Sequence, residues 1–344
     1  MQKVRVGING FGRIGRQVFR ALHAKYQDTV EVVAINDLTS AKMLAHLLKY
    51  DSTQGNYVAQ GHTVDFHEGE GEDNYIVVDG KKIVIYKMPN AADLPWGKLG
   101  VDVVLECTGF YTSKAKAMAH IEAGAKKVVI SAPAGNDLPT VVFSVNENVL
   151  TKEDKVISAA SCTTNCLAPA AKVINDTFGI RHGLMTTIHS YTMSQRILDG
   201  SHKDLRRARA CAMSMIPTST GAAKATALVI PALKGKLDGM AVRVPTPDIS
   251  LVDLTCELEK PATAEEINAA LKAAHDGALH DNMGYCDEPL VSIDFKGSTH
   301  GGVVDALSTQ VMDGTMAKLI IWYDNESGFT NQLARLLRKV AASL

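Results

Sequence analysis

The sequence predicts a doubly wound parallel α/β domain joined to an α+β domain with a mixed or antiparallel sheet. Three observations support this fold class. The chain has 344 residues, more than the roughly 250–300 at which a single hydrophobic core stops growing. Its first half alternates short β-branched runs with helical stretches, the order found in parallel sheets covered on both faces. Its second half has longer strands with few helices between them, which is typical of α+β domains.

The first half follows a strand–helix alternation, interrupted once by a hairpin. β-branched runs predict strands at 4–8, 30–35, 101–105, 127–131, 141–145 and 156–158. Helical spacing predicts helices at 13–25, 40–49 and 113–123, the last closed by Gly124. The dipeptide Asp79-Gly80 joins the runs 75–78 and 81–86, which predicts a type I′ turn and an antiparallel excursion within the parallel domain.

The second half begins with a helix that continues past Cys166 to about residue 177 and contains Pro169. Apolar runs predict strands at 239–244, 249–258, 290–295, 303–311 and 316–323, and a helix is expected at 264–274. A final helix at 329–342 has apolar residues at helical spacing, so we expect it to dock onto the body of the protein.

Composition narrows the possible partners and the cellular compartment. The formal net charge is −1, from 36 basic and 37 acidic residues, so no global field attracts nucleic acid or an anionic membrane. The six cysteines show no metal-ligand spacing and follow no secretory leader, which favours a reducing cytoplasm over a disulfide scaffold and predicts no metal. No apolar run reaches the length of about 18 residues that indicates a membrane-spanning helix.

The segment 10–15 reads GFGRIG, a G-x-G-x-x-G directly after a predicted strand and before a predicted helix. Asp37 ends the second predicted strand, near the spacing of about 20 residues expected for a carboxylate that binds the ribose hydroxyls. The glycines allow the backbone to approach a pyrophosphate at a helix N-terminus. The alternative is a tight turn with Asp37 as a surface cap, but both signals in one βαβ unit favour a Rossmann-type dinucleotide site.

Cys162 lies after the predicted strand at 156–158 and at the start of a helix. The helix dipole and free N–H groups there stabilise an anion, so we expect the thiolate to form below the pKa of about 8.5 of free cysteine. His189, at the end of the apolar run 183–188, is a candidate for the proton-exchanging partner. The alternative is a buried structural cysteine and an unrelated histidine.

Positive charge and hydroxyl groups gather in a second region. The segment 202–209 is rich in arginine, and the Thr-Ser-Thr-Gly at 218–221 precedes a helix that starts at Ala222. Such groups suit a phosphate-sized anion. For Arg206 and Arg209, a solvated face or a subunit contact is the preferred interpretation. Arg243 is the only charge in an apolar strand, and its anionic partner is either a ligand or an internal carboxylate.

Together these motifs resemble the phosphorylating glyceraldehyde-3-phosphate dehydrogenases over nearly the whole chain. The matching segments are 7–15, 35–37, 161–169, 189–192, 202–209, 218–224, 243–247 and 322–326. The resemblance implies a dinucleotide-binding domain at 1–160 and 325–344, a catalytic domain at 161–324, and a cytoplasmic homotetramer. It implies a thioester route from glyceraldehyde 3-phosphate and inorganic phosphate to 1,3-bisphosphoglycerate with NAD, in glycolysis or gluconeogenesis.

The resemblance also implies roles for individual residues. Cys162 would be the nucleophile and His189 its proton-exchanging partner. Thr192 and Arg243 would hold the substrate phosphate. The site for inorganic phosphate would be lined by Ser161, Thr163, Arg207, Thr220 and Gly221. The dinucleotide would be bound by Gly10, Gly12, Arg13, Ile14, Gly15, Asp37, Ser131 and Asn325.

Two departures from the family pattern concern specificity. Relatives commonly have an acidic residue in the turn after the histidine, whereas this chain has Met193-Ser194. The sequence therefore does not predict how tightly the chain binds the substrate phosphate. Gly200-Ser201 replaces the Leu-Pro usual in NAD-restricted members, which reduces apolar bulk against a 2′-phosphate, while Asp37 repels one. We therefore hypothesise NAD use with appreciable NADP tolerance; neutral loop variation is the alternative.

Two other functions fit parts of the pattern. An erythrose-4-phosphate dehydrogenase is the alternative enzyme, but members of that group typically replace the Thr-Gly that this chain retains at 220–221. A nucleotide-binding redox sensor would use the same reactive thiol, but it has no need of two anion pockets.

Overall fold

The computed structural model describes residues 3–344, which divide into two compact units. Unit 1 comprises the described residues of Met1–Val141 together with Asn148–Ala160 and Leu333–Leu344. Unit 2 comprises Val142–Glu147 and Ser161–Gln332. The C-terminal helix α7 (Ser327–Ala341) therefore contributes its first residues to unit 2 and the rest to unit 1. None of the helices within residues 3–344 has the length and hydrophobicity needed to span a bilayer.

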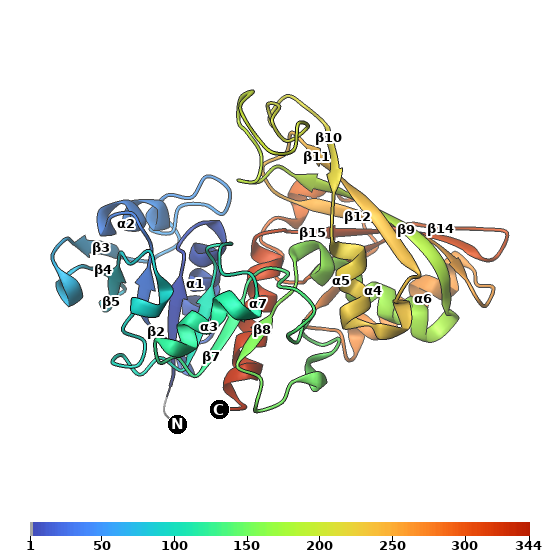
Figure 1. Ribbon diagram of the computed structural model, residues 1–344. Coiled ribbons are helices and arrows are strands. Elements are labelled where there is room, and N and C mark those ends of the chain that lie inside the picture. The colour runs from blue at the N-terminus through green and yellow to red at the C-terminus, as the bar shows by residue number, and fades with distance from the viewer. Residues whose placement is uncertain (1–2) are drawn as a thin grey trace. The chain divides into compact units, whose positions relative to one another are not determined.

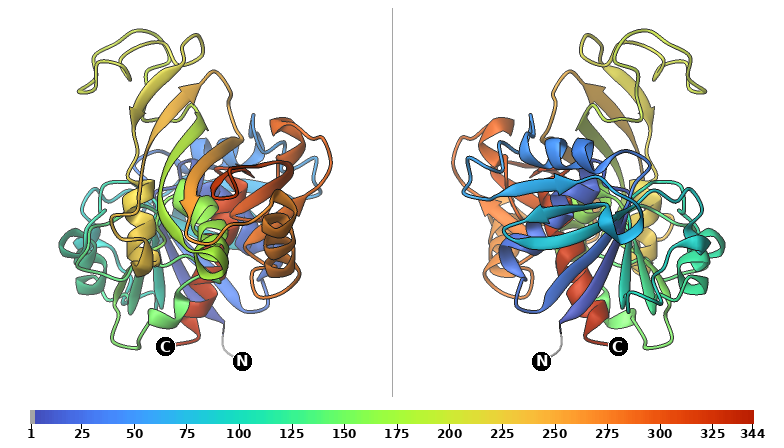
Figure 2. Two further views of the ribbon diagram at one scale, coloured as in Figure 1. Left: turned by 90° about the vertical axis from the view of Figure 1, so that its right-hand side faces the viewer. Right: turned by 90° about the vertical axis from the view of Figure 1, so that its left-hand side faces the viewer.

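Unit 1 contains a sheet whose strands run in the order β3-β4-β5-β2-β1-β6-β7-β8. All strand pairs from β5 to β8 are parallel, while β3, β4 and β5 form an antiparallel edge. The right-hand view of Figure 2 looks onto this unit, with its blue and cyan strands in front. Its principal elements are β1 (Val4–Asn9), α1 (Arg13–Lys25), β2 (Val30–Asn36), α2 (Ala41–Lys49), β3 (Val64–His67), β4 (Tyr75–Val78), β5 (Lys81–Tyr86), β6 (Val103–Glu106), α3 (Lys114–Glu122), β7 (Lys127–Ile130) and β8 (Val156–Ser158).

Local sequence signals explain where these elements start and turn. Ser40 and Ser113 accept hydrogen bonds from backbone N–H groups of the first turns of α2 and α3, as N-cap residues do. In the β4–β5 hairpin, Asp79 and Gly80 have φ of 48° and 76°. Positive φ at both central residues is the signature of a type I′ turn, so the predicted hairpin is confirmed.

The sheet order reverses between β1 and β6, because β2 lies on one side of β1 and β6 on the other. Ligands of doubly wound sheets bind outside the carboxyl ends of the strands at such a switch point. Gly10 follows β1 with φ of 89°, and a Cβ there would lie 2.7 Å from the backbone nitrogen of Thr108. A Cβ on Gly15 would lie 2.1 Å from the carbonyl oxygen of Gly10. Both positions require glycine for this tight strand-to-helix connection.

Unit 2 contains a mixed sheet in the order β10-β11-β9-β12-β15-β14-β13. Helices α4, α5 and α6 pack along one side of it (Figure 1). Because parallel and antiparallel pairs occur together, the predicted mixed sheet is confirmed. The elements are α4 (Cys162–Phe178), β9 (Ile180–Ser190), β10 (Ile216–Ser219), α5 (Ala222–Val229), β11 (Leu237–Val244), β12 (Ser250–Leu258), α6 (Ala264–Asp276), β13 (Met283–Cys286), β14 (Gly302–Met312) and β15 (Met316–Tyr323).

Two predicted strands are wrong. In place of the strand predicted at 141–145, residues 143–146 form a turn, in which the Asn146 side chain accepts the N–H of Val142 and Ser144 has φ of 63°. In place of the strand predicted at 290–295, residues 292–295 form a short 3₁₀ helix, in which the Asp294 carboxylate accepts the N–H of Val291. In both cases a short polar side chain hydrogen-bonds the local backbone and competes with strand pairing.

Three buried acidic residues of unit 2 lie together: Asp248, Asp324 and Glu326. Burial, followed by the charges of Asp324 and Glu326, raises the pKa of Asp248 to about 8. The folded chain therefore keeps a proton that the unfolded chain releases above a pKa of about 3.9. Unfolding free energy then falls as pH rises between these two values, by up to about 1.4 kcal/mol per pH unit.

We expect Asp248→Asn to remove this slope, because an amide keeps a neutral group in place and cannot ionise. The stability gain over the parent chain should grow between pH 5 and pH 8, measured as the unfolding free energy in urea at several pH values. Asp276→Asn is the control, since Asp276 forms an exposed pair with Lys272 in α6. Identical pH profiles for the parent chain and Asp248→Asn would contradict this account.

Candidate active site

Cys162 is the first residue of α4, and the chain reaches it through a strained approach. Ala160 has φ of 60°, and Ser161 is the N-cap whose hydroxyl accepts the N–H of Thr164. The sulfur of Cys162 thus lies at the positive end of a 17-residue helix, as the sequence predicts.

His189 lies near the end of β9, and its Nε2 is 3.5 Å from the Sγ of Cys162. Two contacts fix the ring. Its Nδ1 lies 2.7 Å from the carbonyl oxygen of Ser190, and the ring of Tyr323 packs against it edge-on at a centroid distance of 5.8 Å. The thiol and the imidazole are therefore within reach of each other, with the imidazole oriented by other groups, which is the geometry that a nucleophile and its base require.

The Ser190 carbonyl also accepts a hydrogen bond from Nη1 of Arg243, at 2.9 Å. We assign the proton of the neutral imidazole to Nδ1, where it is donated to this carbonyl. That tautomer leaves the Nε2 lone pair facing sulfur. In the other tautomer Arg243 would donate to Nδ1, 2.8 Å away, and Nε2 could not accept the thiol proton.

The charge state of the resting pair differs from the sequence prediction. Burial raises the pKa of the Cys162 thiol, outweighing the charge of Arg243 and the hydrogen bonds from Thr163 that lower it. Burial and the Arg243 cation lower the pKa of His189 to about 3. The expected lowered thiol pKa is therefore wrong for this structure, because the cost of burying the anion exceeds the helix-terminus stabilisation. The structure holds a neutral thiol beside a neutral imidazole.

A chain of polar groups runs from Arg243 to Arg207. Arg243 Nη1 lies 3.5 Å from the hydroxyl of Thr192, which lies 2.9 Å from that of Ser194, and Arg207 Nη1 lies 3.5 Å from the Ser194 hydroxyl. Two guanidinium groups are thus linked only through hydroxyls, an arrangement that suits a doubly charged anion.

Arg243 lacks a carboxylate among the hydrogen-bond partners that the described residues provide. These are the ring of His189, the Ser190 carbonyl and the Thr192 hydroxyl. Its buried Nε has no partner in residues 3–344. The sequence left two possible anionic partners for Arg243, a ligand and an internal carboxylate. The structure therefore favours a ligand. The guanidinium lies beside the imidazole, and its charge, with burial, lowers the pKa of that ring.

The residues expected around inorganic phosphate fall into two groups. Arg207 donates from Nε to the Thr218 hydroxyl at 2.9 Å, while Gly221 caps α5 and Thr220 accepts the N–H of Ala222. Thr163 differs, because its buried hydroxyl is 3.0 Å from the hydroxyl of Tyr323. The first group lies at a helix N-terminus, where free N–H groups suit an anion, whereas the Thr163 hydroxyl is already hydrogen-bonded to Tyr323.

The residues expected at the dinucleotide lie in unit 1, apart from Asn325. Gly12 caps α1 with no side-chain hydrogen bond, and the first turn of α1 carries no acidic residue. Asp37 accepts the N–H of Phe11 at 2.8 Å and that of Thr39 at 3.2 Å. This glycine cradle and open helix start fit a pyrophosphate, with a carboxylate beside it for the ribose.

The other expected dinucleotide contacts are placed as follows. The Arg13 guanidinium pairs with the buried Asp51 at 2.6 Å, so its side chain is held within unit 1. Ile14 lies half-buried in the first turn of α1, and Ser131 follows β7, donating its N–H to Glu106. Asn325 accepts the hydroxyl of Ser250 at 2.8 Å in unit 2.

Sequence reasoning gave no role to Tyr323, which contacts residues of both α4 and β9 at the site. Its hydroxyl lies 2.7 Å from that of Thr187 on β9 and 3.0 Å from that of Thr163 on α4, and its ring packs on His189. The only sequence signal was its place in the segment 322–326. About 160 residues separate Tyr323 from Cys162, so local patterns do not indicate that the two are close. Gln195, whose oxygen accepts the N–H of Thr192, was also missed.

The nucleotide-binding sheet of unit 1 and the thiol–imidazole pair of unit 2 define a class of dinucleotide-dependent oxidoreductases that use a cysteine nucleophile. Comparison with known proteins narrows this class. The family model described as the NAD-binding domain of glyceraldehyde 3-phosphate dehydrogenase matches residues 4–114, and the model of its C-terminal domain matches residues 161–325. The chain belongs to the glyceraldehyde-3-phosphate dehydrogenase family.

Individual relatives agree over nearly their whole lengths. Glyceraldehyde-3-phosphate dehydrogenase of Priestia megaterium is 57% identical over 340 residues, and glyceraldehyde-3-phosphate dehydrogenase 1 of Bacillus subtilis is 57% identical over 339 residues. The enzyme of Geobacillus stearothermophilus is 56% identical over 340 residues. Each comparison covers 98% of this chain and 98% of the relative.

Proposed function

We propose that the chain oxidises glyceraldehyde 3-phosphate with NAD and inorganic phosphate, giving 1,3-bisphosphoglycerate through a thioester on Cys162. The observation that carries this proposal is the 3.5 Å contact between Cys162 Sγ and His189 Nε2, at a helix start and beside two arginines. The relatives at 53–57% identity carry the name of this activity, and the erythrose-4-phosphate and redox-sensor alternatives are not favoured.

His189 accepts or donates a proton at each step. As the Sγ–carbon bond forms, Nε2 takes the thiol proton and returns it to the carbonyl oxygen, giving a hemithioacetal. Bound NAD supplies the acceptor for the hydride that leaves this carbon. Nε2 takes the hydroxyl proton at the same time, which leaves a thioester. Phosphate oxygen then attacks the thioester carbon, the carbon–sulfur bond breaks, and sulfur regains a proton from His189.

Arg243 links substrate binding to this chemistry. In the structure its guanidinium lies beside the His189 ring and lowers the pKa of that ring. A substrate phosphate between Arg243 and Thr192 would neutralise this charge, so the imidazole becomes a stronger base when substrate is bound. Arg207, with Thr220 and Gly221, would hold the attacking phosphate.

NADP tolerance remains part of the proposal. Gly200 and Ser201 lie in an exposed loop that offers little apolar bulk, where the Ser201 carbonyl accepts a hydrogen bond from Arg196. Asp37 opposes a 2′-phosphate by like-charge repulsion. We therefore expect both cofactors to be used, with NAD preferred.

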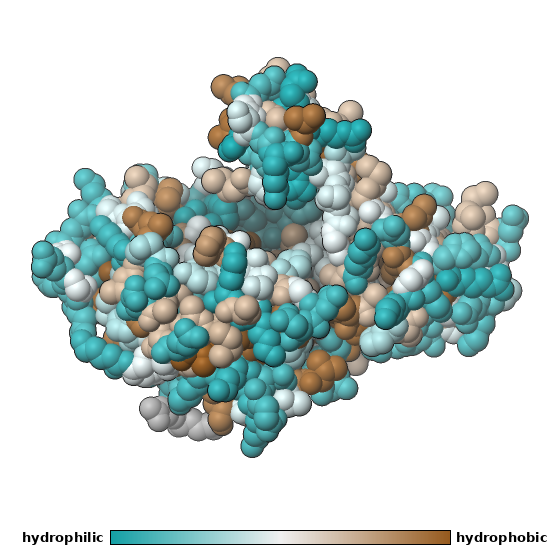
Figure 3. All heavy atoms as spheres, in the orientation of Figure 1, coloured by the Kyte–Doolittle hydropathy of each residue, from teal (hydrophilic) through white to brown (hydrophobic). Residues whose placement is uncertain are grey.

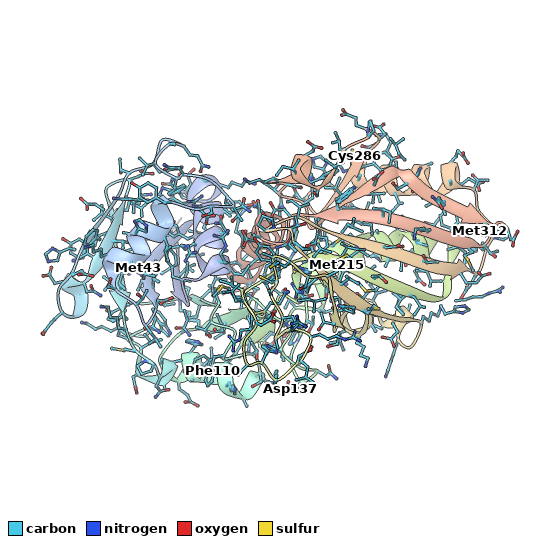
Figure 4. All side chains as sticks on the ribbon, turned by 90° about the horizontal axis from the view of Figure 1, so that it is seen from above. Met43, Phe110, Asp137, Met215, Cys286 and Met312 are labelled. Carbon is cyan, nitrogen blue, oxygen red and sulfur yellow. The ribbon has the colours of Figure 1, made fainter. Side chains whose placement is uncertain are left out.

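Assembly as a homotetramer is supported by apolar surface on unit 2. Figure 3 shows brown side chains on the projecting loops at the top of the view, and exposed residues of this region include Met193, Ile197, Leu198, Leu205, Met213 and Met215. Met312, labelled with Met215 in Figure 4, belongs to a separate exposed set on β14 and β15. Two separate apolar surfaces fit two kinds of subunit contact. The six free cysteines fit a cytoplasmic location.

A spectrophotometric assay with glyceraldehyde 3-phosphate tests the function. With NAD and phosphate we expect steady turnover; without phosphate we expect about one equivalent of NADH per site and then a stop, because the thioester has no acceptor. Steady phosphate-independent turnover would indicate hydrolysis and contradict the proposal. Replacing NAD by NADP should lower kcat/KM without abolishing turnover, and a complete loss would end the hypothesis of NADP tolerance.

A further inference from the structure

Unit 1 contains a second group of chemically reactive side chains that the proposed function does not use. His23, His62 and Asp79 each offer one donor atom, and these three atoms lie within 4.8 Å of one another. Within residues 3–344, this is the only such group of three or more histidine, cysteine or acidic residues. Asp79 Oδ2 lies 2.8 Å from Nε2 of His23 and 2.8 Å from Nδ1 of His62.

The three residues come from three separate segments. His23 lies in the last turn of α1, His62 in the loop before β3, and Asp79 in the turn of the β4–β5 hairpin. Two imidazoles and a carboxylate are a ligand set that first-row transition metals use, with water completing the coordination. Sequence spacing could not predict the group, because 56 residues separate His23 from Asp79.

The surroundings hold these donors in place. The His62 ring stacks on Tyr57 at a centroid distance of 4.0 Å, and His23 stacks on Phe19 at 5.6 Å. The other oxygen of Asp79 accepts the N–H of Thr63 at 2.7 Å and its hydroxyl at 3.1 Å, so Oδ2 is the one that faces the rings. Such supporting contacts orient metal ligands and raise metal affinity.

We propose that His23, His62 and Asp79 bind a divalent transition-metal ion, with Zn²⁺ as the best fit. Zinc lies about 2.0–2.2 Å from nitrogen and oxygen ligands, so donor atoms that share it are roughly 3–3.5 Å apart. The present 2.8 Å contacts therefore need to open by about half an ångström. The side chains of His62 and Asp79 are 25% and 32% exposed, which leaves a path for the ion and room for water ligands.

The site is separate from the dinucleotide cradle at the start of α1. His23 lies 11 positions after Gly12, which caps the other end of α1. At about 1.5 Å per residue the two are roughly 16 Å apart along the helix. The metal would join the end of α1 to the hairpin and the preceding loop, and so stabilise unit 1 without occupying the dinucleotide cradle.

Zinc titration of the full-length chain carrying Cys162→Ser tests the proposal, because that background removes the reactive thiol as a competing ligand. We expect one tight equivalent of Zn²⁺ by calorimetry and a zinc-dependent rise in Tm. His23→Gln, His62→Gln and Asp79→Asn should each weaken binding by at least about 10-fold and remove the Tm rise. NADH binding, followed by fluorescence, should be unchanged by zinc.

His67→Gln is the matched control, since His67 forms an exposed two-residue pair with Asp73 at 3.2 Å in the same sheet edge. It should bind zinc like the background chain. X-ray absorption of the zinc-loaded background chain, which does not depend on variants folding, should show two imidazoles, oxygen ligands and no sulfur. Absence of the tight equivalent, equal affinity in His62→Gln and His67→Gln, or a sulfur ligand would overturn the proposal.

Discussion

Replacing Cys162 by serine is expected to lower kcat by more than about 10³-fold and to abolish the burst of NADH in the absence of phosphate. A serine hydroxyl is a far poorer nucleophile than a thiol, and a neutral His189 with a low pKa cannot ionise it. The resulting ester would also be a poorer acyl donor to phosphate than a thioester. Rapid-mixing absorbance measurements of NADH separate the first turnover from the steady state.

Cys286→Ser is the control for this variant, because Cys286 is half-buried in unit 2, where its thiol donates a hydrogen bond to the Glu288 carbonyl. It should retain the parent kcat. Mass spectrometry after mixing with substrate and NAD, without phosphate, should find an acyl group on the peptide that contains Cys162. Retention of more than a tenth of kcat by Cys162→Ser would refute covalent catalysis at this residue.

Replacing His189 by asparagine is expected to lower kcat by about 10²- to 10⁴-fold, the usual contribution of a positioned acid–base group. Asparagine can keep a polar contact near Ser190 but cannot accept the thiol proton. Burial raises the pKa of the Cys162 thiol, and burial together with the Arg243 cation lowers the pKa of the His189 imidazole. A free thiolate is therefore scarce without a base. Alkylation of Cys162 by iodoacetamide at neutral pH should therefore slow as well.

Two comparisons make the His189 result specific. His182→Asn changes an exposed histidine on the same strand β9 and should leave both rates unchanged. The double variant with Cys162→Ser should be little worse than Cys162→Ser alone, since residues that act as one unit are not additive. Full additivity of the two losses would show that the residues act in separate steps.

Most of the fold could be predicted because its signals are local. The glycine segment, the Asp79-Gly80 turn and the serine N-caps act within a few residues, and the elements around them appear where expected. The two failures are the strands predicted at 141–145 and 290–295. Both runs are apolar, but Asn146, just after the first, and Asp294, within the second, accept hydrogen bonds from the local backbone. Hydrophobicity favours a strand at both places, but a side-chain hydrogen bond decides the local structure.

The sequence was sufficient to predict which residues form the candidate site, but it was less informative about their pKa values. Cys162 and His189 were found from a helix start and a strand end, yet the thiol pKa depends on burial, which the sequence does not reveal. The place of Arg243 beside the imidazole follows from β11 pairing with β9, which aligns Arg243 with His189. Tyr323 was missed for the same reason, since its contacts exist only after β15 joins the sheet.

The two backbone hydrogen bonds that Asp37 accepts make cofactor preference and loop geometry inseparable at this position. Removing the Asp37 carboxylate would take away a charge that repels a 2′-phosphate. Replacement by a residue without a side-chain acceptor would also leave the amide of Phe11 unbonded and loosen the glycine segment before α1. An amide at this position, as in Asp37→Asn, would remove the charge and keep an oxygen that can accept the N–H of Phe11.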